Sequence, residues 1–420
     1  MTTFLILLFV FGYIAIVFEH SININKTASA LLTGVLIWTA YAVFTEDKAL
    51  VSNELSHHLA SVSEILFFLL GAMTIVELID AHQGFKIITD RINSRNPIVL
   101  LWVVGLFTFF LSAILDNLTT SIVMVTLLRK IITKKELRMV FAGIVIIAAN
   151  AGGAWSPIGD VTTTMLWIGG QITSMAIITS LFIPSLVSVA IPLAILSFTL
   201  RNEKLGEIEA NVSNNFSQKD ATIILTFGVA SLLFVPIFKT ITHLPPYLGI
   251  LFGLGVVWVV SEILHSEKDD ENKKPFTVAH ALSKIDTSSI LFFLGILLAI
   301  SALESTHILK NLSSWMDNTI GNQDIIVISI GLASAIIDNV PLVAATMGMY
   351  DLASYPTDHR IWEFLAYCAG TGGSILIIGS AAGVAVMGME KINFIWYFKK
   401  FTLITALGYF AGAGIYILLS

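Results

Sequence analysis

The sequence predicts an all-α polytopic membrane protein, built as inverted repeats with two re-entrant hairpins and two broken transmembrane helices. Of its 420 residues, 56% are hydrophobic and only 12% are charged, whereas about 25% are charged in an average soluble domain. Apolar runs of about 20 residues, long enough to cross the hydrocarbon core as a helix, recur along the whole chain. Four apolar segments are interrupted, two by Asp-Asn and two by glycine-rich stretches.

Hydropathy predicts the elements in order. The first apolar run has no basic leader and no small-residue cleavage site, so we expect a retained helix rather than a signal peptide. Segments 97–132 and 322–354 are expected to be hairpins that return to the side they enter from. Residues 137–170 and 360–388 contain the glycine-rich stretches and are expected to be broken helices, because glycine and proline favour unwound backbone. The ten predicted crossings are 3–19, 27–45, 60–80, 137–170, 174–200, 219–238, 244–264, 286–306, 360–388 and 394–419.

The placement of positive charge supports this count. Cytoplasmic loops carry an excess of Lys and Arg. With both hairpins re-entrant, all of the 23 basic residues except Lys48, Lys239, Lys310 and Arg360 fall on one face. We therefore expect a multi-pass protein of the cytoplasmic (inner) membrane of a prokaryote, with both termini outside. No basic residue is expected at membrane depth, and buried charges that are only acidic favour a positive substrate.

An internal repeat divides the chain. Leu66-Phe67-Phe68-Leu69, Asp116-Asn117 and Gly152-Gly153 return in the same order as Leu291-Phe292-Phe293-Leu294, Asp338-Asn339 and Gly372-Gly373. The expected units are a first repeat at 1–200, a cytoplasmic linker at 201–218 and a second repeat at 219–420. An odd number of crossings separates the Asp-Asn pairs, so the repeats should be inverted and their tips should meet near the midplane, where such transporters bind substrate.

The interruptions predict an ion site. Non-helical backbone survives at membrane depth only inside protein or around an aqueous cavity. Carbonyls at a helix break, together with carboxylates, can replace the water shell of a hard cation. Aligning the Gly-Gly pairs puts Asp160 opposite Ser380, so the site should be asymmetric in charge. The candidate ligands are Asp116, Asn117, Thr119, Thr120, Asn150, Ser156, Asp160, Thr163, Asp338, Asn339, Thr371, Ser374 and Ser380, with Glu64 as a candidate neighbour.

Each candidate also has a purely structural interpretation. The three aspartates precede expected helix starts, where Asp is a favoured N-cap. The asparagines could satisfy loop backbone, the Ser and Thr hydroxyls could bond back to a helix carbonyl, and Glu64 could lie at the membrane interface. Cys368 is the only cysteine, so neither an intramolecular disulfide nor a cysteine metal cluster is expected.

Three motifs resemble the NhaD family of sodium/proton antiporters, within an ion-transporter superfamily that also contains arsenite and dicarboxylate carriers. They are the Asp-Asn-Leu-Thr-Thr run at 116–120, the stretch from Asn150 to Asp160 with the three threonines at 162–164, and 334–341 around Asp338-Asn339. The resemblance covers nearly all of the chain. It implies alternating-access exchange of Na⁺ (or Li⁺) for H⁺, the superfamily fold of scaffold and transport domains, and a homodimer. It also implies functional carboxylates at Asp116, Asp160 and Asp338, Na⁺ held there with Asn117 and Asn339, and neither a cofactor, an enzymatic activity nor a nucleic-acid partner.

Under this hypothesis, Na⁺ and H⁺ compete for one carboxylate cluster. Two alternatives stay open. An arsenite or organic-anion transporter of the same superfamily is the closer one, although the dicarboxylate branch carries Ser-Asn-Thr at both tips, where this chain has Asp-Asn. An intramembrane aspartyl protease also uses two buried aspartates, but Asp160 follows Pro157-Ile158-Gly159 rather than Gly-x-Gly, and the order relative to Tyr350-Asp351 is reversed.

Overall fold

The computed structural model describes residues 1–89, 92, 94, 96–201, 203, 217–266 and 273–420. The described part is helical and contains no strand, which confirms the all-α prediction. Most of the expected linker at 201–218 lies outside the described residues. Eight helices in the described part are long and apolar enough to cross a membrane: α3 (Lys26–Phe44), α4 (Lys48–Ala81), α8 (Lys135–Ala154), α10 (Ser174–Thr199), α11 (Gln218–Thr242), α12 (Pro246–Leu264), α15 (Thr287–Ser305) and the span Phe394–Leu419.

The two other expected crossings are shorter than a full span. The first is α1 (Thr2–Val17), and the second divides into α19 (Arg360–Gly372) and α20 (Ala381–Glu390). The last span comprises α21 (Phe394–Tyr397), a π-helical turn (Phe398–Thr402) and α22 (Leu403–Leu419). Helix α4 begins 12 residues before the predicted 60–80, because its first turns are polar and hydropathy does not detect them.

All four predicted interruptions separate pairs of helices. The first Asp-Asn lies between α6 (Pro97–Ser112) and α7 (Asn117–Ile131), and the second between α17 (Gln323–Ala333) and α18 (Asn339–Met349). Residues 155–160 separate α8 from α9 (Val161–Ile168), and residues 373–380 separate α19 from α20. Asp116, Asp160 and Asp338 are the N-caps of α7, α9 and α18, as the sequence predicts.

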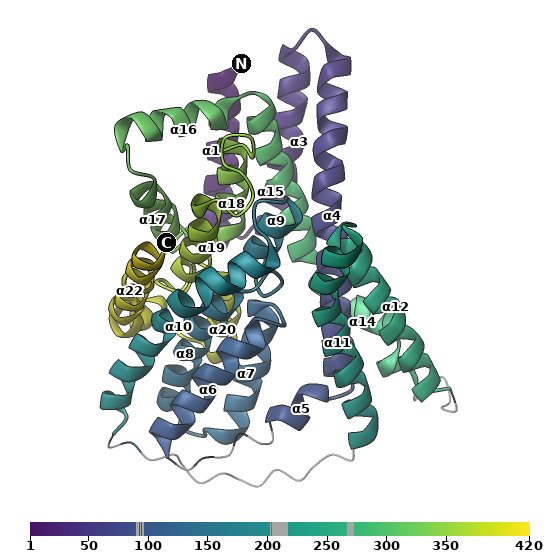
Figure 1. Cartoon of the computed structure of the whole chain (residues 1–420), viewed down its shortest axis with the longest axis vertical. Helices are drawn as coiled ribbons and strands as arrows, with labels where there is room; N and C mark the ends of the chain where they lie inside the picture. Colours follow the sequence, from purple (N-terminus) through teal and green to yellow (C-terminus); the bar gives the residue numbers. More distant parts are fainter. Residues whose placement is uncertain (90–91, 93, 95, 202, 204–216, 267–272) are drawn as a thin grey trace.

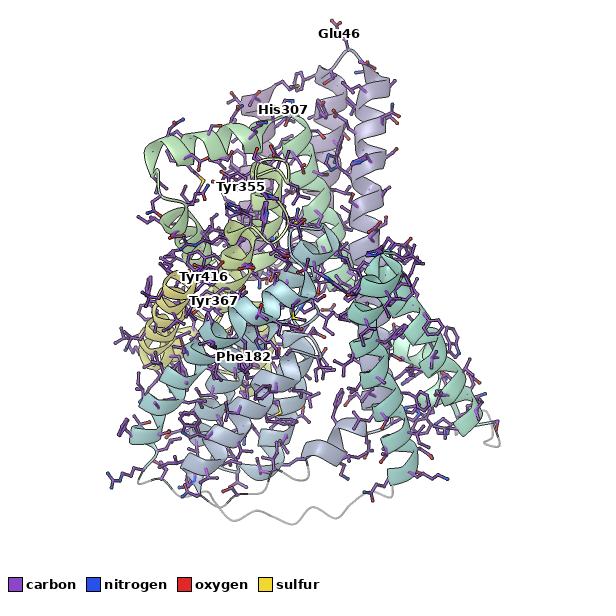
Figure 2. All side chains as sticks on the ribbon, in the orientation of Figure 1. Glu46, Phe182, His307, Tyr355, Tyr367 and Tyr416 are labelled. Atoms are coloured by element: carbon purple, nitrogen blue, oxygen red, sulfur yellow. The ribbon has the colours of Figure 1, made fainter. Side chains whose placement is uncertain are left out.

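The helices are arranged along one long axis (Figure 1). Helices α6, α7 and α8 occupy the lower half, whereas α16 (Ile308–Thr319), α17 and α18 occupy the upper half. Figure 2 places Glu46, in the turn between α3 and α4, at the upper end, and Tyr367 near the middle. Helix pairs α3–α15, α11–α12 and α10–α22 pack along their lengths. The short helices α2 (Glu19–Ile22), α5 (Gly84–Thr89), α14 (Val278–Lys284) and a 3₁₀ turn (Lys274–Phe276) complete the described chain.

Helix α8 is the most deeply buried of the long helices in the described part of the chain. In its most apolar stretch 89% of the residues are buried, against 28–56% in the other seven long spans. Every residue of α19 from Ile361 to Gly372 is buried as well. The first parts of the two broken helices, α8 and α19, are therefore surrounded by protein, which is the condition for irregular backbone within a membrane.

Close backbone contacts hold the two glycine-rich breaks in matching ways. A Cβ added to Gly152 would lie 2.2 Å from the carbonyl oxygen of Phe109, and one added to Gly372 would lie 2.0 Å from that of Gly331. Likewise, the hydroxyl of Ser112 donates to the carbonyl of Ala149 at 2.6 Å, and that of Ser334 donates to the carbonyl of Ala369 at 2.8 Å. The same contacts therefore fix α6 on α8 and α17 on α19.

Candidate functional site

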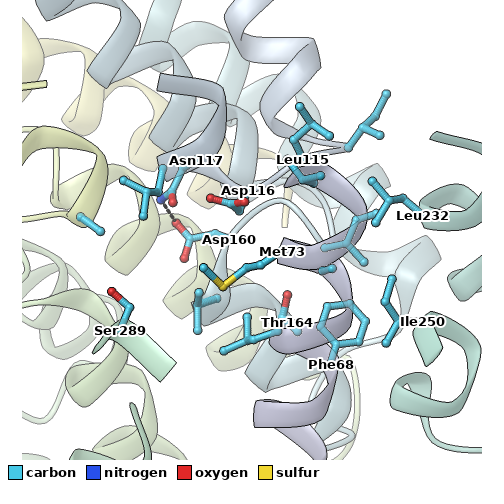
Figure 3. Close-up of a pocket in the computed structure, with 18 of the residues that line it drawn as sticks. Phe68, Met73, Leu115, Asp116, Asn117, Asp160, Thr164, Leu232, Ile250 and Ser289 are labelled. Atoms are coloured by element: carbon cyan, nitrogen blue, oxygen red, sulfur yellow. Dashed lines mark hydrogen bonds between the residues drawn. The ribbon is translucent and has the colours of Figure 1, made fainter. Parts of the chain in front are cut away.

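A pocket lies where α7 and α9 begin (Figure 3). Its polar wall includes Asp116, Asn117 and Asp160. Apolar side chains of α4, among them Phe68 and Met73, form another wall. Ser289 of α15 lines it from the second half of the chain. The pocket thus brings together three of the predicted site residues against a largely apolar lining.

Asp160 is held by hydrogen bonds on both oxygens. One oxygen accepts from the backbone nitrogen and hydroxyl of Thr162 at 2.9 and 2.8 Å. The other accepts from the amide of Asn117 at 2.6 Å, the contact drawn in Figure 3. Asp160 is only 2% exposed. Both oxygens have fixed directions, and the carboxylate lies at the N-terminus of α9, where the helix dipole favours negative charge.

Asn150 connects this carboxylate site to the second glycine-rich break. Its side-chain oxygen accepts from Asn117 at 3.0 Å. Its amide nitrogen donates to the hydroxyls of Ser374 and Ser380 at 3.1 and 2.9 Å. Asn150 is fully buried, so these bonds replace all of its contacts with water. Five predicted site residues therefore form one hydrogen-bonded chain from Asp160 to Ser380.

Asp116 lines the same pocket with no basic partner. Its oxygens accept from the backbone nitrogen and hydroxyl of Thr119 at 2.8 and 2.6 Å. Among the described residues, no Lys, Arg or His forms an ion pair with Asp116 or Asp160. No group of three or more His, Cys, Asp or Glu in the described chain could hold a metal ion. Any cation here would need amide, hydroxyl or carbonyl oxygens in addition to the two carboxylates.

The second Asp-Asn pair does not line this pocket. Asp338 pairs instead with Lys26, whose ammonium lies 3.5 Å from a carboxylate oxygen. Lys26 is half-buried, and among the described residues the fully buried Asp, Glu, Lys and Arg side chains are all acidic, as expected. Asn339 is 5% exposed, and its amide nitrogen has no hydrogen-bond partner. Its counterpart Asn117 donates to Asn150 and Asp160, whose own counterparts in the second half are Gly370 and Ser380.

The remaining predicted residues bond mainly to backbone. Ser156 donates to the carbonyl of Ala113, Thr163 to that of Asp160, and Thr371 to that of Tyr367. Thr120 is buried, with no partner for its hydroxyl. Glu64 is not among the residues that line the pocket. Thr162, which donates twice to Asp160, was not among the predicted ligands, although it belongs to the threonine run that follows the helix break.

Comparisons with known proteins agree with this arrangement. A family model described as "Citrate transporter" (CitMHS) matches residues 13–363. Sodium/proton antiporter 1 of Arabidopsis thaliana is 52% identical over 98% of this chain and 71% of its own length. The Na(+)/H(+) antiporter NhaD of Alkalimonas amylolytica is 30% identical over 99% of this chain and 90% of its own length.

Among solved structures, the YdaH transporter of Alcanivorax borkumensis is similar in fold, with a TM-score of 0.62 and 12% sequence identity over 94% of this chain and 98% of that one. Taken with the family model and the two sequence relatives, this match identifies the chain as a multi-pass membrane protein of the CitMHS transporter family, within the NhaD-type antiporters.

Proposed function

We propose that this chain is a secondary active transporter that exchanges Na⁺ (or Li⁺) for H⁺. The observation that carries the proposal is the pair of carboxylates, Asp116 and Asp160, that share one pocket and have no basic partner among the described residues. Unpaired acidic groups inside a membrane protein need a cation or a proton to neutralise them. The names of the relatives, sodium/proton antiporter and NhaD, support the same activity.

In the proposed cycle, Na⁺ and H⁺ compete for these carboxylates. A hard cation prefers oxygen ligands. Asp116 and Asp160 would supply charge, and the side-chain oxygen of Asn117 and nearby hydroxyls would complete the coordination shell. Arrival of protons neutralises the carboxylates and releases the cation, and arrival of the cation releases the protons. The same pocket can therefore bind either ion in turn, but not both ions at once.

Alternating access is proposed to follow from inverted repeats with re-entrant hairpins. The matched contacts at Gly152 and Gly372, and at Ser112 and Ser334, support two structurally equivalent halves. Two halves of opposite orientation can exchange conformations, so that the same site opens first to one side of the membrane and then to the other.

We further propose that the protein is a homodimer and that both termini lie on the side of the membrane opposite the basic loops. The bacterial relatives favour the cytoplasmic membrane of a prokaryote.

The direct test uses everted vesicles or proteoliposomes with a preformed acid-inside gradient. Added Na⁺ or Li⁺ should dissipate the gradient, and D116N and D160N should abolish this response. D47N is the matched control, because Asp47 is exposed, caps the start of α4 and does not line the pocket. A wild-type chain that gives no Na⁺-dependent proton movement, or D116N and D160N variants that both exchange at the wild-type rate, would contradict the proposal.

The description of the family model gives a second candidate, the transport of citrate or a similar organic anion. Physical chemistry disfavours it at this pocket, because a tricarboxylate would face Asp116 and Asp160 with no basic side chain to compensate their charge. Labelled citrate or arsenite uptake by the same proteoliposomes distinguishes the candidates. Uptake that is insensitive to D116N and D160N would move the substrate site elsewhere.

A further inference from the structure

The second Asp-Asn carries a feature that the first lacks, an ion pair with a lysine. The ammonium of Lys26 lies 3.5 Å from a carboxylate oxygen of Asp338, and the two side chains are 32% and 17% exposed. Among the predicted site carboxylates, no other forms an ion pair within the described part of the chain. The partners are 312 residues apart in sequence, so the fold alone brings them together.

Several contacts fix the backbone of Lys26. Asn25 caps α3 by accepting from the backbone nitrogen of Thr27 at 2.8 Å. The hydroxyl of Thr27 donates to the carbonyl of Ser288 at 3.0 Å, which ties this turn to the start of α15. The backbone nitrogen of Lys26 donates to Glu19 at 3.0 Å. The first turn of α3 therefore has a defined position beside α15, and α15 in turn packs against α18.

The ammonium group also has a second favourable contact. It lies 4.5 Å from the ring centroid of Phe292, which is fully buried. A cation over an aromatic face gains electrostatic energy, and gains more where water is excluded. The ammonium of Lys26 therefore interacts with both a carboxylate and an aromatic ring. Tyr13 of α1, Glu19 and Asp160 are other titratable groups near this pair, and Asp160 is close enough to feel the charge of Asp338.

The equivalent position at the first Asp-Asn holds no such cation. Asp116 accepts only from Thr119, and its pocket contains no basic side chain. Two equivalent helix starts thus carry different charges: Asp116 needs a cation or proton from outside, whereas Asp338 already has a cation that belongs to the chain. A metal cation could join Asp338 only by displacing Lys26 or by approaching a like charge.

We propose that Lys26 is a tethered counter-ion that neutralises Asp338, so that the transported cation is exchanged at Asp116 and Asp160 alone. This inference rests on the proposed cation/proton exchange and assigns Lys26 as a positioning residue. The pair adds no net charge to the half of the protein that must rearrange, and it holds the start of α18 against α3 and α15. In this proposal, Asp338 is required for transport because it balances the charge of Lys26. It does not coordinate the transported ion.

The test compares D338N, K26M and K26M/D338N in proteoliposomes, with Na⁺ affinity also measured by binding to the purified chain. D338N leaves the Lys26 charge uncompensated, so turnover should fall about tenfold or more. Its half-saturating Na⁺ concentration should stay within about threefold of wild type, because no ligand of the ion has been removed. The double variant removes both charges and should recover at least about tenfold over D338N.

Two controls separate this inference from a general structural effect. K310M/D338N carries the same loss of a lysine on the exposed face of α16 and should stay as slow as D338N. K26R keeps the charge and should exchange faster than K26M. A double variant that folds and is no faster than D338N overturns the inference.

The affinity measurement decides the case even where the double variant does not fold. A D338N chain whose Na⁺ affinity falls about tenfold or more would show that Asp338 binds the transported ion. If D338N gives that result and the wild-type chain still exchanges Na⁺ for H⁺, this inference is overturned and the proposed function stands. A wild-type chain that neither binds nor moves Na⁺ removes both.

Discussion

Asn150 is the residue through which the first carboxylate site contacts the second glycine-rich break. Its oxygen accepts from Asn117 and its nitrogen donates to Ser374 and Ser380, all without access to water. Only a carboxamide offers an acceptor on one side and two donors on the other. Asp at this position would add a third negative charge next to Asp160. Ala would remove one hydrogen bond each from Asn117, Ser374 and Ser380 and would leave the buried hydroxyl of Ser374 without a partner.

We predict that N150A lowers Na⁺-driven exchange by about tenfold or more, because each buried polar group left without a partner costs about 1–3 kcal/mol. Initial rates of proton efflux in proteoliposomes measure the loss. N311A is the matched control, since Asn311 is an exposed asparagine of α16. An N150A chain as active as N311A would mean that the hydrogen-bonded chain from Asp160 to Ser380 has no part in transport.

At the scale of single residues, the sequence predicts groups that interrupt apolar segments and fails for groups that do not. Asp116, Asn117 and Asp160 stand out because polar residues are costly within a membrane span, and the structure places them around one pocket. Lys26 gives no such signal, because it stands at the edge of an apolar run where basic residues are common. Its partner Asp338 is 312 residues away in the sequence, and no local sequence pattern predicts a contact over that separation.

At the scale of helices, the Gly152 and Gly372 contacts set how closely α6 can approach α8 and α17 can approach α19. A methyl group at either position would collide with a backbone carbonyl, Phe109 in the first half and Gly331 in the second. Backbone cannot move aside as a flexible side chain can, so the helices would have to separate. The Asp and Ser caps of α9 and α20 would shift with them.

We predict that G152A and G372A each lower the free energy of unfolding by about 1–3 kcal/mol, the usual range for overpacking a filled core. G255A is the control, because no atom lies within 4 Å of a Cβ added there on α12, and alanine favours a helix. Denaturation of the purified proteins in detergent measures the difference. G152A or G372A variants as stable as G255A would show that these helix pairs are not close-packed in the membrane.

Helix breaks are more predictable than helix starts in this chain. Glycine, proline and Asp-Asn mark all four interruptions, because each leaves a local signal in an otherwise apolar segment. The start of α4 and the whole of α16 were not predicted from hydropathy, since both are too polar on average. Helix α16 has one apolar face, with Ile308 and Leu309 buried, and its polar residues lie elsewhere on its surface. Only the packing of the complete chain decides such elements.

At the scale of the whole molecule, Glu390 joins elements from the first and second halves of the chain. It ends α20 in the second half, and its oxygens accept from Arg129 at the end of α7 and Arg138 in α8, each at 2.7 Å. The Glu390 side chain is 1% exposed, whereas those of Arg138 and Arg129 are 18% and 45% exposed. Three interrupted elements from both repeats are thereby fixed to one carboxylate, so they should move as one unit when the transporter changes conformation.

Unequal burial predicts an order of effects at this junction. E390Q should cost about 3–5 kcal/mol of unfolding free energy, because it removes the shared partner of two charges, one of them largely buried. R138M should cost less, since Glu390 keeps one arginine. R129M should cost at most about 1 kcal/mol, because water screens a half-exposed arginine. Unfolding of the purified variants, with exchange rates measured in parallel, tests this order. K399M changes an exposed basic residue of the π-helical turn and serves as the control.

If R129M lowers the stability as much as E390Q, the junction depends on the exposed pair and the halves are joined at the surface. If E390Q matches the control, α7, α8 and α20 are held together by packing alone and their movement as one unit does not depend on charge.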